Sequence, residues 1–300
     1  GWTHTINRPD LADIYRLELN PENENQYRFD GEWRDFERDT ARMRVRLWGR
    51  ISWVFKRELL WSVHGPAVRH ENGAYAIRFA GYGEVRQLEQ WYRMNKARNL
   101  DEFIDAMRMM ALPSLNTLYA DREGNMFYAY NGQFPVRAEG YNWKQYLPGD
   151  TSETLWTEIL PFEKIPQVLN PPSAFIQSCN NSPFHTTVGE GNPRPEDFSP
   201  TLGIETHYTN RSRRALELYG KDEPITREEF YAYKYDKPYA PESGIARYVE
   251  EVANTPMPDE PLLQEAVLLL KQWDRTTTKD NRSAALALLI GEGHRKRAGW

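Results

Sequence analysis

The segment NTLYADREGNMFYAY, residues 116–130, has the pattern of two strands joined by a tight turn. Strand-forming residues such as Thr, Leu, Tyr and Phe fill both ends, and the five residues between the ends are charged, polar or glycine. Gly124-Asn125 stands where such a turn needs a positive φ angle, which glycine and asparagine adopt most readily. The segment therefore predicts an antiparallel β-hairpin.

The chain before and after this hairpin divides into strands followed by helices. Period-2 alternation predicts strands at 13–19, 43–47 and 74–79, and a further strand is expected at 174–178. Apolar residues at helical spacing predict helices at 84–96 and 100–111, the second capped by Asn99 or Asp101, and at 211–219, 226–234, 244–254, 262–273 and 281–298. Residues 135–172 and 183–206 are expected to be irregular. This grouping favours an α+β fold, with a β-rich portion at 1–205 and a mostly helical portion at 206–300.

Composition and motifs exclude several classes of function. The chain has 300 residues, a net charge of −5 and one cysteine, Cys179. An acidic balance gives no indication of a nucleic-acid or anionic-membrane partner, and the longest apolar run is too short to span a bilayer. No phosphate-binding glycine loop, no GxSxG nucleophile motif and no zinc spacing among the six histidines is present, so no organic cofactor and no zinc site is expected.

Three polar or aromatic features are candidates for function, and each also has a purely structural explanation. Asn180-Asn181-Ser182-Pro183 has the composition of a turn, yet its amides can also donate to a reacting group. Asp10 and Asp13 suit a hard cation such as calcium, or simply the polar start of a strand. Trp91 lies on an apolar helix face and belongs either to the core or to a pocket wall.

The order of these features along the chain identifies a family. The run from Trp2 to Tyr15, WTHTINRPDLADIY, resembles penicillin acylases and acyl-homoserine-lactone acylases. Matching blocks follow in the same order at 27–33, 64–66, 90–92, 116–121, 124–125, 160–162, 170–171, 180–183 and 272–274. The family belongs to the N-terminal-nucleophile hydrolases. The resemblance therefore implies a four-layer αββα sandwich of antiparallel sheets, incomplete here, with a helical C-terminal part.

The resemblance also implies an amide-cleaving mechanism. Family members attack with the first residue of their β chain, usually a serine released by autocatalytic cleavage of a precursor, and its α-amine is the base. An α-amine has a pKa of about 7.7–8.0 and is available as a base near neutral pH. Asn180 matches the side-chain donor of the oxyanion hole, the backbone N–H of Ile6 the second donor, and Arg211 a supporting arginine.

The same resemblance implies a structural calcium ion and an acyl pocket. Asp10 and Asp13 match carboxylate ligands of the calcium ion, and Ala12 matches a carbonyl ligand. Asp197 and a backbone carbonyl near Trp143 are expected to complete this chain's share of the site. Trp91 and Leu115 match positions that line the pocket for an acylated small-molecule substrate.

The sequence departs from the family at the nucleophile. Gly1 has no attacking group, and the nucleophile, its flanking N-terminal β-chain segment and the α chain of relatives have no counterpart. The chain thus resembles an internal piece of an acylase β chain, which alone should be inactive; the family implies a periplasmic or secreted location. The residues at 63–66, 90–92 and 197–200 resemble the acyl-homoserine-lactone acylases more closely and so favour homoserine-lactone over β-lactam substrates. The alternative from another class is a non-catalytic binding protein on an acylase scaffold.

Overall fold

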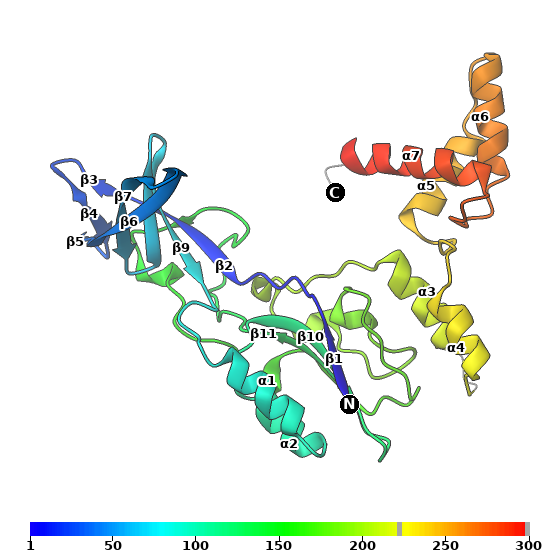
Figure 1. Ribbon diagram of the computed structural model, residues 1–300, viewed down its shortest axis with the longest axis horizontal. Helices are drawn as coiled ribbons and strands as arrows, with labels where there is room; N and C mark the ends of the chain where they lie inside the picture. The colour runs from blue at the N-terminus through cyan, green and yellow to red at the C-terminus, as the bar shows by residue number, and fades with distance from the viewer. Residues whose placement is uncertain (221–223, 298–300) are drawn as a thin grey trace.

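The computed structural model describes residues 1–220 and 224–297, and its first sheet contains the predicted hairpin (Figure 1). The sheet is antiparallel, in the order β1 (Trp2–Thr5), β10 (Ser114–Ala120), β11 (Met126–Gly132) and β13 (Gln167–Leu169). At the turn, Gly124 takes the positive φ, and one carboxylate oxygen of Asp121 accepts the backbone N–H groups of Glu123 and Asn125. The hairpin at 116–130 is therefore confirmed.

Two helices lie beside this sheet and close its core. They are α1 (Gln87–Lys96) and α2 (Leu100–Met107), and their buried side chains Met94, Phe103 and Met107 pack with residues of β10 and β11. Asn99, not Asp101, caps α2: its side chain accepts the N–H of Glu102 at 2.9 Å. The helix predicted at 84–96 begins three residues later, at Gln87.

A second sheet has its own core. Its order is β12 (Leu147–Pro148), β2 (Ala12–Leu17), β9 (Gly73–Phe79), β8 (Gly65–His70), β7 (Ile51–Ser62) and β6 (Glu37–Trp48). A small third sheet contains β3 (Leu19–Asn20), β4 (Asn23–Phe29) and β5 (Glu32–Asp35). Every second residue of β2 is buried, as the alternation predicts, and Tyr15 and Leu17 pack there against Leu60, Trp143 and Trp156.

The strand predicted at 174–178 is wrong. Its backbone is not paired in a sheet; Ala174 has a φ of +50°, and Gln177 donates its N–H to the carbonyl of Thr186 within a loop. Phe175 stacks on Tyr219 of the helical part and Ile176 packs against the first core, so both apolar residues are partly buried without belonging to a strand. Short 3-10 turns occur here and in the other irregular stretches: η1 (Ser152–Thr154), η2 (Phe162–Lys164), η3 (Pro183–His185), η4 (Pro195–Asp197) and η5 (Pro200–Leu202).

The last third of the chain is helical. The helices are α3 (Asn210–Tyr219), α4 (Arg227–Lys234), α5 (Gly244–Asn254), α6 (Pro261–Lys271) and α7 (Arg282–Arg297), each within one or two residues of its predicted bounds where both ends are described. A third core cluster joins α5, α6 and α7 through Val249, Leu270, Trp273 and Ala287. Among the described residues no helix is long and apolar enough to cross a bilayer. The division at 205/206 stays a prediction.

His64 supplies a titratable group inside the second core. Its ring stacks on Tyr15 with centroids 4.0 Å apart, and its Nε2 lies 3.0 Å from the carbonyl oxygen of Gly149. Burial lowers the pKa of the imidazole to about 4. The neutral ring is the folded form, since a charged ring would lose its hydration without gaining an acidic partner.

This burial predicts a pH dependence of stability. The unfolded chain takes up a proton on His64 near pH 6.5 and the folded chain only near pH 4. Lowering the pH through this window therefore costs the wild type on the order of 3 kcal/mol of unfolding free energy. Urea unfolding at several pH values should show a smaller decline for His64→Gln, which cannot titrate. Equal declines in the two proteins would contradict the assignment.

Candidate active site

Asn180, Ile6 and Arg211 come together at the turn that follows the 174–178 segment. The side-chain nitrogen of Asn180 donates to the carbonyl oxygen of Ile6 at 2.8 Å, across 174 residues of sequence. Arg211, in the first turn of α3, donates from Nη2 to the side-chain oxygen of Asn180 at 2.9 Å. Asn180 thus contacts both of the other residues predicted to be catalytic.

These two contacts fix which way the Asn180 amide points. A guanidinium can only donate, so the side-chain oxygen faces Arg211 and the NH₂ group faces Ile6. One N–H is used by the Ile6 carbonyl, and the second N–H of the same nitrogen is the one that can donate to a reacting oxygen. The backbone of Asn180 has a φ of +56°, a conformation that asparagine tolerates better than most residues.

The rest of the turn holds Asn180 in place. Asn181 is buried; its side-chain oxygen accepts the N–H of Cys179 at 2.8 Å and its side-chain nitrogen donates to the carbonyl of Ser182 at 2.7 Å. Ser182 donates its backbone N–H to the carbonyl of His207 at 3.1 Å. The second asparagine is therefore part of the turn, while the first projects toward Ile6.

A polar network that the sequence analysis missed ties β1 to this turn. The Thr5 hydroxyl shares a hydrogen bond with Ser178 at 2.7 Å and accepts from the side chain of Asn116 at 3.1 Å. Tyr128 donates its hydroxyl to Asn116 at 2.7 Å. Asn116 and Tyr128 are fully buried. In the sequence, only Asn116, a polar residue within the first strand of the predicted hairpin, indicated this network.

Glu205 was also missed, because it lies in the stretch expected to be an irregular loop. One of its oxygens accepts the backbone N–H of Arg8 and the hydroxyl of Tyr130, both at 3.1 Å, and the other lies 3.0 Å from Nδ1 of His207. Burial raises the pKa of the Tyr130 hydroxyl. Glu205 thus links the segment between β1 and β2, which contains Ile6, to His207, whose carbonyl accepts the N–H of Ser182.

The predicted calcium ligands Asp10 and Asp13 lie around a buried arginine. Oδ2 of Asp13 accepts from Nε of Arg137 at 2.9 Å and from the indole of Trp156 at 2.7 Å. Arg137 also lies 3.3 Å from Oδ1 of Asp10, and its guanidinium is 5.3 Å from the ring of Trp143. Burial raises the pKa of the Asp13 carboxyl, and the charge of Arg137 opposes that rise.

The residues present fit a hard cation in part. Oδ1 of Asp13 is buried and has no hydrogen-bond partner, which leaves a carboxylate oxygen for a cation beside the Asp10 carboxylate. Ala12 is exposed at the start of β2. Asp197 pairs with Arg194 at 2.7 Å on an exposed turn, and within the described residues no group of three His, Cys, Asp or Glu could hold a metal.

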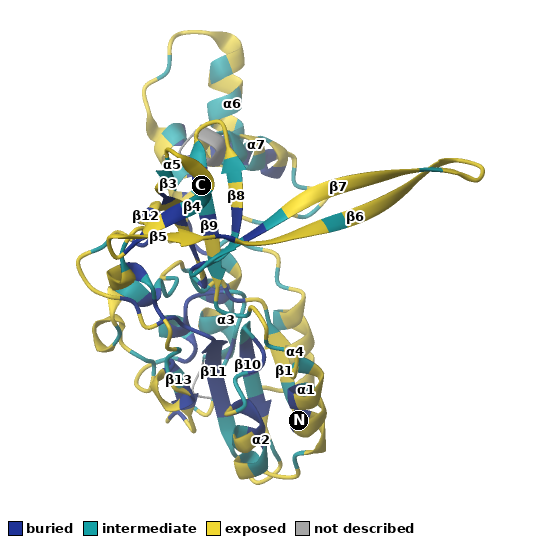
Figure 2. Ribbon diagram, turned by 90° about the vertical axis from the view of Figure 1, so that its left-hand side faces the viewer, coloured by how far each residue is buried: buried dark blue, intermediate teal, exposed yellow. Residues whose placement is uncertain are grey.

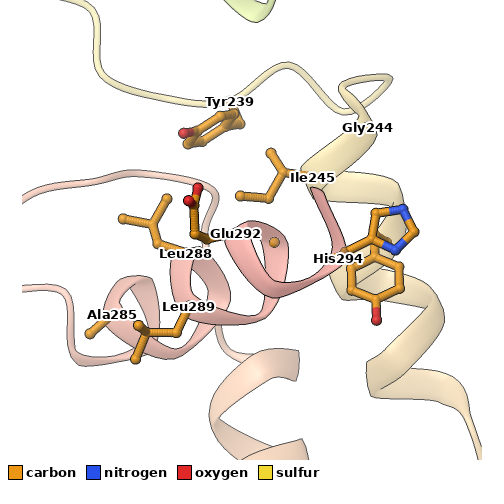
Figure 3. A pocket seen from close by; sticks show the side chains of 10 residues that line it. Tyr239, Gly244, Ile245, Ala285, Leu288, Leu289, Glu292 and His294 are labelled. Atoms are coloured by element: carbon orange, nitrogen blue, oxygen red, sulfur yellow. The ribbon is translucent and has the colours of Figure 1, made fainter. Parts of the chain in front are cut away.

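The two predicted pocket residues are half-buried against the first core. Trp91 stacks on His4 with centroids 6.3 Å apart, and its indole N–H is buried without a hydrogen-bond partner. Leu115 precedes Asn116 on β10. A hollow of about 910 Å³ lies elsewhere, between α5 and α7 (Figure 3). It is lined by Tyr239, Ile245, Tyr248, Leu288, Leu289 and His294 among others, and by no predicted site residue.

The ion pair of Arg137 and Asp13 yields a prediction about stability. Both side chains are fully buried, so Arg137→Met leaves an uncompensated charge and should lower the unfolding free energy by about 3–5 kcal/mol. Arg194→Met breaks the exposed pair with Asp197 and should cost less than about 1 kcal/mol. Denaturant unfolding measures both. Adding Asp13→Asn to Arg137→Met should restore part of the loss, and equal effects of the two arginine variants would refute the prediction.

Comparison with known proteins gives consistent results. A model of the penicillin amidase family matches residues 1–291. The chain is 32% identical to penicillin G acylase of Escherichia coli over 187 residues, which are 61% of this chain and 21% of that protein. It is 30% identical to the acyl-homoserine lactone acylase PvdQ of Pseudomonas fluorescens (strain Pf0-1) over 136 residues, 43% of this chain and 18% of that protein.

A solved structure has the same fold over nearly the whole chain. The thermostable penicillin G acylase of Alcaligenes faecalis matches with a TM-score of 0.72 and 26% identity, covering 93% of this chain and 49% of that chain. The chain therefore spans about a fifth of the length of these two curated relatives and about half of the solved chain. Because the family match covers all but the last nine residues, the resemblance predicted from the sequence is confirmed, and the chain belongs to the penicillin amidase family.

Proposed function

We propose that the chain is part of an amide hydrolase that removes acyl groups from small molecules with an N-terminal serine supplied from outside these 300 residues. The observation that supports this function best is the Asn180 amide, which Ile6 and Arg211 orient from two sides. The amide is held at both its nitrogen and its oxygen, so its orientation is fixed. The same arrangement directs one N–H toward the space beside the Ile6 backbone.

In the proposed mechanism the serine hydroxyl attacks the amide carbonyl while the α-amine of the same residue takes its proton. The carbonyl oxygen becomes an oxyanion, which accepts from the second N–H of Asn180 and the backbone N–H of Ile6. Collapse of the tetrahedral intermediate breaks the C–N bond, and the amine leaves with the proton. Water then hydrolyses the acyl-serine ester. Arg211 keeps the Asn180 oxygen turned away from the oxyanion.

For the substrate we propose that the acyl group lies along Trp91 and Leu115. Their half-buried side chains offer an apolar wall, which suits either an aliphatic chain or a phenylacetyl group. The two named relatives differ in this respect: one is a penicillin G acylase and the other an acyl-homoserine lactone acylase. The residues at 63–66, 90–92 and 197–200, which resemble acyl-homoserine-lactone acylases more closely, favour the homoserine-lactone substrate. The four-layer sandwich, precursor processing, an α-chain partner and a periplasmic or secreted location are further proposals from family membership.

The oxyanion assignment predicts a specific kinetic defect. In an enzyme that contains these residues together with the nucleophile segment and the α chain, Asn180→Ala should lower kcat about 10²–10³-fold and leave KM within a few-fold. Release of product from long-chain acyl-homoserine lactones and from benzylpenicillin measures both constants and the preference between the substrates.

Two controls make the result interpretable. Asn95→Ala changes an exposed asparagine of α1 and should leave kcat unchanged. The 300-residue chain alone should hydrolyse neither substrate. If Asn180→Ala stays within a few-fold of wild type, Asn180 is not the donor. If the complete coding sequence has no Ser, Thr or Cys at the processing site, the catalytic proposal fails and the binding-protein alternative takes its place.

We also propose a structural Ca²⁺ at Oδ1 of Asp13, with the Asp10 carboxylate, the Ala12 carbonyl, a carbonyl near Trp143 and Asp197 as further ligands. The buried oxygen of Asp13 without a partner supports this choice. When bound, the ion would neutralise the second oxygen of a carboxylate whose first oxygen already binds Arg137. Arg78, directly opposite Asp13 on β9, is a second cation nearby, but the structure shows no hydrogen bond from it to the Asp13 carboxylate.

Calcium binding predicts a rise in thermal stability by mass action. Ca²⁺ binds only the folded chain and should raise Tm in proportion to ln(1 + [Ca²⁺]/Kd), whereas Mg²⁺, which demands a tighter octahedral site, should raise it less. Asp13→Asn should remove the response, and Asp105→Asn, an exposed aspartate on α2, should keep it. A Tm that responds equally in wild type and Asp13→Asn would exclude this site.

A further inference from the structure

The hairpin of β6 and β7 projects from the second sheet into solvent (Figure 2). Both strands have twelve residues, and β6 is the edge strand of its sheet. Nearly every residue from 42 to 58 is exposed, and only the base of β7, near Leu60, reaches the second core. The family function described above assigns no role to this projection.

The register of the hairpin places most of its large apolar side chains on one face and most of its cations on the other, although Arg57, opposite Ala41, shares the apolar face. Met43 lies opposite Phe55, and Val45 opposite Trp53; because directly opposed residues share a face, these four form one apolar face. The rings of Trp53 and Phe55 stack with centroids 5.9 Å apart. All four side chains are more than two-fifths exposed, which is unusual for residues of this kind.

The other face is cationic. Arg42 lies opposite Lys56, Arg44 opposite Val54, and Arg46 opposite Ser52. Residues 41–57 contain six Lys or Arg and no Asp or Glu, so this distal part of the hairpin carries +6 in a chain whose net charge is −5. The whole-chain charge therefore conceals a strongly basic projection.

The tip of the hairpin is apolar and aromatic. Trp48 is 84% exposed, and Leu47 and Ile51 are 58% and 64% exposed. Arg46 precedes them in the sequence, and Arg50 lies between Trp48 and Ile51. Large apolar side chains with arginines beside them are the composition of segments that enter the boundary between lipid headgroups and acyl chains.

We propose that the β6–β7 hairpin docks on an anionic lipid bilayer, with its apolar face and tip in the headgroup region and its arginines against the lipid phosphates. A bilayer offers an apolar layer for the apolar face and the tip, and the long arginine side chains of the opposite face can extend back to the negatively charged headgroups above that layer. The projection seen in Figure 2 lets the hairpin reach a flat surface before the acidic remainder of the chain meets it.

Charge disfavours a second copy of the chain as the occupant. Antiparallel pairing of two β6 edges would bring arginines at 42, 44 and 46 of one copy beside those of the other, and like charges opposite one another destabilise a sheet. Stacking two apolar faces would bring two segments of +6 together. An anionic bilayer surface causes neither of these repulsions between cations.

Sedimentation of the 300-residue chain with vesicles tests the proposal. The chain should bind vesicles of phosphatidylcholine mixed with phosphatidylserine, should not bind phosphatidylcholine alone, and should be released by salt. Arg42→Gln and Arg44→Gln together should weaken binding roughly fivefold per charge removed. Trp48→Ser with Trp53→Ser should weaken binding at least as much, because the apolar contribution is lost.

Matched substitutions outside the hairpin serve as controls. Arg122→Gln removes an exposed cation of the β10–β11 turn, and Leu88→Ser an exposed apolar residue of α1; both should leave vesicle binding unchanged. Circular dichroism confirms that the variants fold. The proposal is overturned if wild type binds no anionic vesicles, if binding is equal to neutral vesicles, or if the hairpin variants bind like wild type. It is also overturned if Trp48→Ser with Trp53→Ser converts a dimer to a monomer in sedimentation velocity, since a second copy then covers this face.

Discussion

The buried pair of Arg137 and Asp13 holds together the parts of the chain on which the site depends. A guanidinium and a carboxylate that are both removed from water are stable only when paired and hydrogen-bonded, so each fixes the other. Arg137 also donates to the carbonyl of Thr201 at 2.8 Å. Four residues later Glu205 binds the backbone of Arg8, two residues beyond Ile6. Through residues 201–205, the pair thus anchors the backbone near Ile6, which contacts Asn180.

Local patterns in the sequence predicted local structure well. The hairpin at 116–130 formed and a helix formed in each predicted place, because neighbouring residues decide turns, caps and amphipathic faces. The helices predicted at 84–96 and 100–111 are shorter than expected, at Gln87–Lys96 and Leu100–Met107. The strand predicted at 174–178 was wrong because a short apolar run does not distinguish a strand from a loop segment whose side chains pack against other parts of the fold. Glu205 and Arg137 were not predicted as site-forming residues, because the contacts of Glu205 with Arg8 and of Arg137 with Thr201 span more than 60 residues and form only in the folded chain.

In the candidate site, too, the sequence predicted residues but not their geometry. The resemblance to acylases supplied Asn180, Ile6 and Arg211, and the structure brings the three into contact without testing their roles. Neither composition nor spacing predicted which amide atom faces Arg211, since that orientation depends on a donor 31 residues away. The net charge of −5 likewise describes only the chain as a whole. Six cations gathered on one hairpin are invisible in an average taken over the whole chain.

One short connection carries both the proposed oxyanion donor Ile6 and the proposed cation ligand Asp10. Residues 6–11 join β1 of the first sheet to β2 of the second, and Ile6 lies at one end while Asp10 lies near the other. The position of Ile6 relative to Asn180 therefore depends on the second sheet as well as on the pairing of β1 with β10 and the contact of Thr5 with Ser178. Arg137 and Glu205 already fix it at Asp10 and Arg8. A cation at Asp13 would tighten the same attachment, so a loss of metal should loosen the oxyanion hole even though no metal ligand touches the substrate.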